Sequence, residues 1–379
     1  MNKISYLILI YNLLIFKTLH IHRSSLKYSS LLSKNTLQMP QHIRFILIFS
    51  CLILRGSVIY GQDPVFSQWY ASPLQTNPAF AGTNQAPFIA LNYRMQYPSF
   101  NNGAAYSTFA ASYDQALNRS NSSIGISIMT DDAGQGILKK TYASAIYSYK
   151  VSINEDMAVK IGVEGGMISS NLDWNKLIFL DQIDPITGWT NPDGTIRPSQ
   201  EVRPDQTNRT IFDISTGLLL YASGFHVGLS AKHLATPDES FLKSTNSNLR
   251  IGLPTRWSLH GGYEFVIQKG NRFRPTSFIT PSLLIVKQGD FAQFVGGVYA
   301  GLGPIFTGVW YRHALSNPES AIFTVGFRQD YFKVGYSYDF PVGGLANRTG
   351  GTHEVSLTLN LNPNKNKKQD LTDCFKMFR

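Results

Sequence analysis

Cysteine is almost absent from this chain of 379 residues. Only Cys51 and Cys374 occur, one near each end of the sequence. The central part of the chain therefore has no disulfide framework and no thiolate metal site. Its fold must depend on backbone pairing and side-chain packing alone.

Charged residues are also scarce, at 15% of the chain, where soluble domains typically have about a quarter. The formal net charge of +10 is concentrated at the N-terminus. Residues 1–61 hold seven basic residues and no acidic residue, which leaves 27 basic and 24 acidic residues in the remainder. Because the remainder shows no clustered basic patch, we expect no nucleic-acid binding.

The familiar catalytic signatures are missing. The sequence contains no His-Glu-x-x-His motif, no P-loop and no dinucleotide fingerprint. The Gly-x-Ser-x-Gly motif of serine hydrolases is absent too. We therefore predict no catalytic residue, no cofactor and no metal site, and a protein that is not an enzyme.

Long apolar runs are missing after Gly61, where no stretch approaches the 18 residues of a membrane helix. Upstream, Met39 to Gly61 has the features of a signal peptide, with Arg44 before a short apolar core at 45–54. We expect Met39 to be the true start and residues 1–61 to be removed; the alternative is an unusually long leader. If the mature chain is integral to a membrane, only a closed barrel remains.

Aromatic residues and glycine are abundant, with 19 Tyr, 24 Phe and 31 Gly. From Pro87 onward, runs of about ten residues alternate in character: Val159, Ile161 and Val163 share one face, opposite Lys160 and Glu164. Such runs are typical of transmembrane strands, and they predict an all-β protein whose antiparallel barrel of about 14 strands occupies residues 87–362. The predicted strands are 87–97, 104–115, 122–130, 139–152, 156–169, 210–222, 224–234, 255–268, 276–287, 290–301, 303–314, 320–329, 331–339 and 353–362.

Loop lengths predict the orientation of this barrel. The segments at 131–138, 170–209, 235–254 and 340–352 are long and lie at one end, whereas most connections at the other end are tight. Long external loops and short periplasmic turns are typical of bacterial barrels. We therefore expect a cell outer membrane protein with 170–209 outside and both termini periplasmic. The connections near Gly289 and at 269–275 depart from this rule.

The inward face of the strands carries polar side chains. They either line a pore or form ion pairs that close it, and the sequence leaves both alternatives open. A barrel enzyme would need a serine nucleophile beside His226 or His260; simple lumen polarity is the favoured interpretation. The predicted lumen-lining residues are Lys160, Glu164, Asp213, His226, Lys232, His260 and Glu264.

Several motifs carry a resemblance to a known family. The segment from Gln62 to Tyr70 is followed by Asn77-Pro78-Ala79-Phe80-Ala81-Gly82, by Tyr93-Arg94-Met95-Gln96 and, near the end, by His353-Glu354-Val355-Ser356-Leu357. Over residues 62–362 the chain resembles the PorP/SprF family of Bacteroidetes membrane proteins, although Tyr97 replaces the usual Trp. Residues 335–340 are a further closing motif, and weaker matches are Asp184-Pro185, Lys232-His233-Leu234 and Pro281-Ser282.

The resemblance implies an outer-membrane barrel of the type IX secretion system. Such a protein assists export or surface attachment of large adhesins and is often linked to gliding motility. Its implied partners are outer-membrane lipid, periplasmic and outer-membrane secretion components, and the adhesin cargo. The alternative function is that of a porin or transporter for a small solute.

The two ends of the mature chain are the candidate partner-binding elements. Residues 62–86 contain no convincing strand, so they either plug the lumen or pack against a periplasmic partner. Residues 363–379 form a basic tail that we expect to hang in the periplasm. The predicted partner-binding residues are Asn77, Pro78, Ala79, Phe80, Gly82, Arg94, Lys365, Lys367 and Lys368.

Overall fold

The structure is a computed structural model, and it describes most of the chain after Gly61. The described residues are 62–84, 86–99, 105–117, 120–241, 252–270, 276–315, 317–342, 349–361, 375 and 377–378. The predicted leader at 1–61, with its start at Met39, lies outside them, as do Lys365, Lys367 and Lys368. No helix among the described residues is long and apolar enough to cross a membrane.

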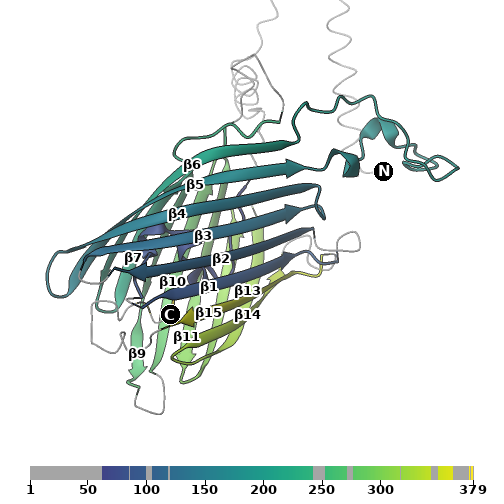
Figure 1. Cartoon of the computed structure of the whole chain (residues 1–379). Helices are drawn as coiled ribbons and strands as arrows, with labels where there is room; N and C mark the ends of the chain where they lie inside the picture. The colour runs from purple at the N-terminus through teal and green to yellow at the C-terminus, as the bar shows by residue number, and fades with distance from the viewer. Residues whose placement is uncertain are drawn as a thin grey trace, which may run out of the picture. The chain divides into compact units, whose positions relative to one another are not determined.

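Within these residues the strands form one antiparallel sheet that closes on itself (Figure 1). Each strand pairs with the next along the chain, and β1 closes the ring by pairing with β15. Because β8 and β9 both pair with β10, they form one interrupted span, and the fifteen strand segments make fourteen spans. This confirms the predicted fourteen-stranded barrel. The strands are β1 (Phe88–Gln96), β2 (Tyr106–Ala116), β3 (Ser122–Ala133), β4 (Leu138–Ser152), β5 (Met157–Leu172), β6 (Asn208–Ala222), β7 (Phe225–Lys232), β8 (Arg256–Tyr263), β9 (Phe265–Gln268), β10 (Ser277–Gln288), β11 (Phe291–Leu302), β12 (Ile305–Ala314), β13 (Asn317–Arg328), β14 (Phe332–Pro341) and β15 (Thr352–Asn360).

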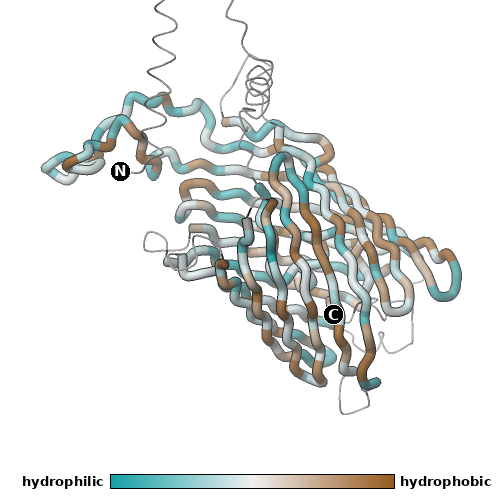
Figure 2. Tube along the Cα trace, turned by 180° about the vertical axis from the view of Figure 1, so that it is seen from behind, coloured by the Kyte–Doolittle hydropathy of each residue, from teal (hydrophilic) through white to brown (hydrophobic). Residues whose placement is uncertain are grey.

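The alternation along each strand separates two faces. On β5, Ile161 and Val163 are exposed on the outside, whereas Lys160 between them is buried on the inside. Figure 2 shows the same alternation as hydrophobic positions that recur along the strands. The apolar outer face suits contact with lipid. A closed barrel can lie in lipid because its strands pair their backbone polar groups with one another.

The lumen is filled by the segment before β1, which we call the plug (residues 62–84). The plug contains two short 3-10 helices, η2 (Trp69–Ala71) and η3 (Pro78–Phe80), and one helical turn, α3 (Pro73–Thr76). Proline at a first helical position leaves no amide donor unpaired there. The turns fold the plug compactly enough to lie inside the barrel.

The plug runs along the lumen from one end of the barrel to the other. At its start, Asp63 bonds to Gln288, where β10 ends beside the short turn to β11. At its finish, Gly82 bonds to Asp114 near the opposite end of the wall, next to the start of β1. The first end also carries the 173–207 loop, so we call it the long-loop end.

Candidate functional site

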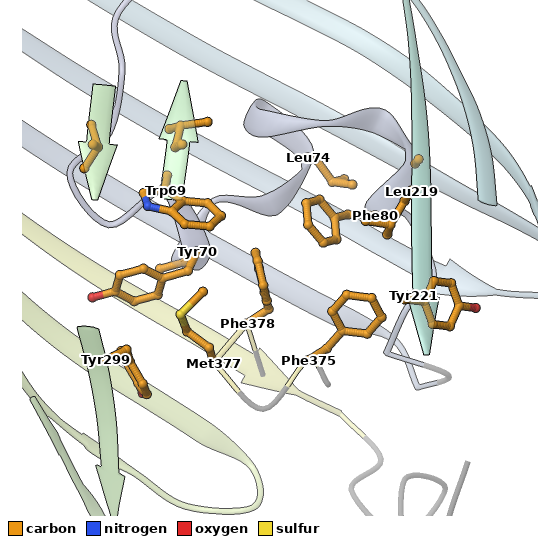
Figure 3. Packing of buried hydrophobic residues seen from close by; sticks show 14 of the residues in the cluster. Trp69, Tyr70, Leu74, Phe80, Leu219, Tyr221, Tyr299, Phe375, Met377 and Phe378 are labelled. Atoms are coloured by element: carbon orange, nitrogen blue, oxygen red, sulfur yellow. The ribbon is translucent and has the colours of Figure 1, made fainter. Parts of the chain in front are cut away.

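Aromatic side chains form the centre of the contact between the plug and the barrel wall (Figure 3). Trp69, Tyr70 and Phe80 are at most 1% exposed. The Tyr70 ring stacks on Trp310 with centroids 5.7 Å apart and meets the edge of Tyr299 at 5.3 Å. A buried aromatic contact of this kind contributes about 0.5–1.5 kcal/mol beyond its buried area.

Asn77 anchors the plug to the wall by its side-chain amide. Its amide nitrogen donates to the carbonyl oxygens of Leu218 at 3.0 Å and Leu229 at 3.3 Å. The side-chain oxygen of Asn77 accepts a hydrogen bond from the backbone amide of Ala79 at 2.9 Å, and this bond caps η3. The Asn77 side chain therefore ties the plug to backbone carbonyls of both β6 and β7.

Glycines in the wall make room for this anchor. A Cβ atom at Gly217 would overlap the side chain of Asn77, and one at Gly162 would overlap the backbone of Pro78 and Ala79. Gly162 and Gly217 are direct partners across β5 and β6. We call these two glycines the glycine cradle, because together they let the Asn77–Ala79 backbone lie directly against the sheet.

The end of the plug is held by a second set of polar contacts. The Gly82 amide donates to Asp114 at 2.6 Å, and the Ala81 carbonyl accepts from Ser148 at 2.8 Å and from the Lys160 ammonium group. Gly82 has a φ of +68°, which disfavours other residues. The sequence motif from Asn77 to Gly82 is thus used for contacts within the chain itself.

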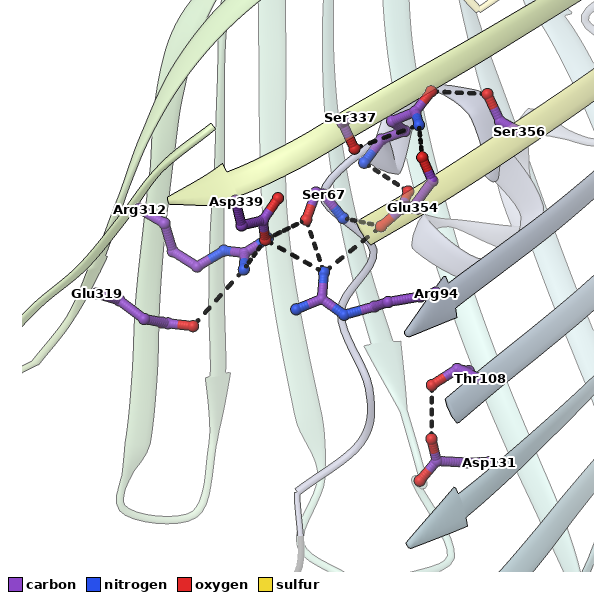
Figure 4. Close-up of polar contacts among 11 residues, drawn as sticks. Ser67, Arg94, Thr108, Asp131, Arg312, Glu319, Ser337, Asp339, Glu354 and Ser356 are labelled. Carbon is purple, nitrogen blue, oxygen red and sulfur yellow. Dashed lines mark hydrogen bonds and ion pairs between the residues drawn. The ribbon is translucent and has the colours of Figure 1, made fainter. Parts of the chain in front are cut away.

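A buried charged cluster lies around Ser67 (Figure 4). The Ser67 hydroxyl donates to Asp339 at 2.6 Å and accepts from Arg94 at 2.6 Å and Arg312 at 2.7 Å. Arg312 also pairs with Asp339 at 2.8 Å. Each guanidinium group thereby has both a carboxylate and a plug hydroxyl as partner, which offsets the cost of burying the charge.

Glu354 completes this cluster from β15. Its two carboxylate oxygens accept the backbone amides of Ser67 and Gln68, both at 2.8 Å, and Arg94 lies 3.4 Å away. The Gln68 side chain adds a donor to Ser337 and an acceptor for Ser356. The amides of Ser67 and Gln68, which precede η2, are thus held by a carboxylate of the wall.

Asp63 forms a further contact at the long-loop end. Its carboxylate lies 2.6 Å from His233, whose other ring nitrogen lies 2.9 Å from Asp213. Burial alone would lower the pKa of His233, but the Asp63 and Asp213 carboxylates outweigh burial and raise it to about 9. Burial would raise the pKa of Asp63, but His233 and then Arg256 hold it well below its ordinary value. The pair is therefore ionised near neutral pH.

The residues predicted to line the lumen all have positions on the inside of the barrel. Glu164 pairs with Lys232 at 3.2 Å, and Asp213 and Lys160 have the contacts given above. His226 and His260 are at most 1% exposed and lie beneath Phe378 and Phe80 respectively. Glu264 is buried between β8 and β9. Ion pairs and plug contacts, rather than an open pore, account for most of these side chains.

The end of the chain also lies in the lumen, which differs from the free periplasmic tail expected from the sequence. Phe375, Met377 and Phe378 are buried, and the Phe378 ring packs on Phe80 with centroids 4.6 Å apart. Lys333 donates to the Met377 carbonyl oxygen. Sequence reasoning considered the charge of the tail and overlooked its three apolar side chains, for which the aromatic interior offers burial.

Space remains chiefly at the long-loop end. A cavity of about 1110 Å³ lies there, and Gln62 to Val65 form part of its lining together with wall residues that include Arg94, Arg312 and Glu319. Beside the plug, a second space lined by Gln75, Glu164 and His233 has a volume of only about 50 Å³. The lumen is therefore wide at the long-loop end and tightly filled beside the plug.

The same packing leaves no evident catalytic arrangement among the described residues. Ser230, near His260 across the β7–β8 pair, donates its hydroxyl hydrogen to the Thr76 carbonyl oxygen, and both histidines are buried. No group of three or more potential metal ligands occurs in the part of the chain that the structure describes. The arrangement can bind and position segments of polypeptide, as it does with its own ends.

Comparison with known proteins gives the family. The model of the type IX secretion system membrane protein PorP/SprF matches residues 58–359. The chain belongs to this family. The match includes the plug, the glycine cradle and all fourteen spans of the barrel.

Several solved structures align with this chain at low sequence identity and low TM-score. The toluene transporter TbuX of Ralstonia pickettii is 10% identical, with a TM-score of 0.43, over 76% of this chain and 91% of that one. The outer membrane protein Omp33 of Acinetobacter baumannii is 8% identical, with a TM-score of 0.39, over 73% and 99%. The monoaromatic hydrocarbon channel CymD is 11% identical, with a TM-score of 0.39, over 80% and 94%. No curated protein matches the chain.

The hypothesis that the plug motif docks on a secretion component meets a constraint in this PorP/SprF chain. Asn77, Phe80 and Arg94 are buried against the chain's own barrel, so docking through them would require the plug to leave the lumen. Lys365, Lys367 and Lys368 lie outside the described residues. Partner binding by these residues stays a prediction.

Sequence reasoning missed several residues that hold the plug. Arg312, Asp339, Trp310 and the glycine cradle are examples. Glu354 did stand within a family motif, although nothing in that motif indicated its role. Alternation assigns a residue to the inner face, but it does not reveal which inner residues meet a segment without periodicity.

Proposed function

We propose that this protein assists type IX secretion as a closed docking barrel, and that cargo does not pass through its lumen. In this role it supports the export or surface attachment of large adhesins, together with periplasmic and outer-membrane components of the secretion system. Gliding motility is the cellular process that such adhesins would serve.

The filled lumen is the observation that supports this proposal. Trp69, Tyr70 and Phe80 occupy its centre, and buried hydrogen bonds from plug amides to the carboxylates of Glu354 and Asp114 fix the plug on either side of them. A folded adhesin, or even an extended chain, would first have to displace these contacts. A porin for small solutes is disfavoured for the same reason.

The orientation that we propose places the 173–207 loop outside the cell. Pro87 and Leu361, which bond to each other at the other end of the barrel, then face the periplasm. In this orientation Gln62, where the plug starts, lies in the lumen near its external end. The first and last strands of the wall, by contrast, begin and end at the periplasmic face. This differs from the sequence-based expectation that both termini hang in the periplasm, because the plug crosses the whole lumen.

A gene deletion with surface proteomics tests the proposed function. Proteins released by brief proteolysis of intact cells are compared between the parent strain, the deletion strain and a complemented strain. We expect one or a few large surface proteins to disappear on deletion and to return on complementation, with uptake of small solutes unchanged. An unchanged surface proteome with impaired solute uptake would reject the docking role in favour of a porin.

A further inference from the structure

The 173–207 loop between β5 and β6 is the largest segment that extends from the long-loop end (Figure 1). It contains six acidic and three basic residues, which gives it a formal charge of −3. Two short 3-10 helices, η4 (Trp174–Lys176) and η5 (Leu180–Gln182), are its only helical parts. Loops of this length are commonly solvated and mobile.

The loop is instead braced by its own hydrogen bonds. At its tip, Asp184 and Gly188 form an antiparallel bridge, and the Asp184 carboxylate accepts the amides of Ile186 at 2.8 Å and Thr187 at 3.0 Å. Arg197, on the returning part of the loop, lies 3.4 Å from the same carboxylate. The Ile186 amide, more than any other contact, lowers the pKa of Asp184, so this brace is ionised near neutral pH.

A second brace joins the outgoing and returning parts closer to the barrel. Asp181 accepts the Ser199 hydroxyl at 2.9 Å and the Gln200 amide at 2.6 Å. This contact brings the neighbourhoods of Leu180 and Val202 together. The backbone of the loop is thus fixed at its tip and at its base.

The braced loop presents apolar side chains to the exterior. Ile186 is 94% exposed, Leu180 is 89% exposed and Val202 is 82% exposed, and Trp189 is about half exposed. We call these four residues the loop apolar surface. Single exposed apolar residues are common, but here four lie on one segment whose backbone is fixed by its own hydrogen bonds.

We propose that the loop apolar surface docks a secreted protein that presents an apolar patch surrounded by basic residues. The proposal rests on the proposed function and deepens it by naming the surface that receives the cargo. Aromatic and aliphatic anchors supply the binding energy of such contacts, while charges at the rim set partner choice and encounter rate.

The charge of the loop favours a basic protein over the other occupants. A second copy would bring an identical loop of charge −3 against the first, and like charges repel. A phosphate-bearing membrane surface would be repelled for the same reason. A basic protein surface suits both the net negative charge of the loop and the exposed Ile186, Leu180 and Val202.

Substitution of the apolar residues tests the proposal in cells. The triple variant Leu180→Ser, Ile186→Ser and Val202→Ser removes the anchors without touching a brace. The matched control is Thr187→Ser, Gln200→Ser and Gln206→Ser on the same loop. The readout is the amount of those surface proteins whose display depends on this barrel in the deletion experiment, normalised to the amount of folded barrel. We expect the apolar triple variant to lose about tenfold in display, and the control to equal the parent.

A photo-crosslinking amino acid at Ile186 identifies the occupant in intact cells. We expect a crosslinked product that antibodies against a barrel-dependent surface protein recognise. A product of twice the barrel mass would replace the proposal with a dimer, and crosslinks to lipid alone would replace it with membrane contact.

If deletion of the gene removes surface proteins but the triple variant displays them normally, the loop inference fails while the proposed function stands. If deletion itself changes no surface protein, the proposed function fails.

Discussion

Replacing Gly217 by alanine is the sharpest perturbation of the plug. The new Cβ atom would overlap the Asn77 side chain, so the two hydrogen bonds from Asn77 to the carbonyl oxygens of Leu218 and Leu229 would be lost. Each such bond contributes about 0.5–1.5 kcal/mol net. We therefore expect the free energy that holds the plug in the lumen to fall by about 2 kcal/mol, which corresponds to a rise of about 30-fold in the released fraction.

Cysteine labelling measures the released fraction directly. Ser72 is 3% exposed, and its hydroxyl group has no partner among the described residues, so Ser72→Cys changes little. In a Cys374→Ser background, a maleimide reagent reports when the plug opens. The matched control is Gly165→Ala, where the nearest atom to a new Cβ is 3.9 Å away, on Phe212. The reasoning is refuted if Gly217→Ala labels at the rate of the parent and of this control while the barrel folds normally.

Three further predictions concern the other contacts. Raising the pH through about 9 deprotonates His233 and removes a stabilisation that is complete below its ordinary pKa near 6.5, and lowering the pH well below 3.8 protonates Asp63. Amide hydrogen exchange of the first plug residues, corrected for intrinsic rates, should therefore be slowest between these two pH limits. An exchange rate that does not change with pH would contradict the pairing of Asp63 with His233. Glu354→Ala should destabilise the folded barrel by about 3–5 kcal/mol, because it leaves two plug amides and an arginine without their carboxylate; a melting temperature equal to that of the parent would count against the cluster. Val163→Lys, on the lipid face, should cost about 2–4 kcal/mol and reduce the yield of heat-modifiable barrel more than Glu164→Gln on the inner face, and equal yields would argue against the face assignment.

The wall of the barrel could be predicted from the sequence because a strand with one lipid face and one inner face has a fixed period of two. Val159, Ile161 and Val163 show this period clearly, and the predicted strands agree with the observed ones to within a few residues. The interruption at Glu264, between β8 and β9, was not predicted from the sequence.

The interior could be predicted only in part. Alternation gives the inner face to Lys160, Glu164 and His226, yet it says nothing of their partners. The plug has no period, because short 3-10 turns and polar contacts at single residues determine its path. Asn77 illustrates the limit: its place in a motif that carries the family resemblance was visible, but its carbonyl partners on β6 and β7 depend on the three-dimensional closure of the wall.

The central claim is that the chain's own two ends close the lumen, and ion conductance tests it most directly. Purified full-length mature protein and a variant that lacks residues 62–82 and 375–379 are reconstituted into planar bilayers after folding is verified by heat-modifiability. We expect the full-length barrel to give no stable conductance steps and the variant to give uniform ones. Conductance of the full-length barrel as large as that of the variant would contradict the account.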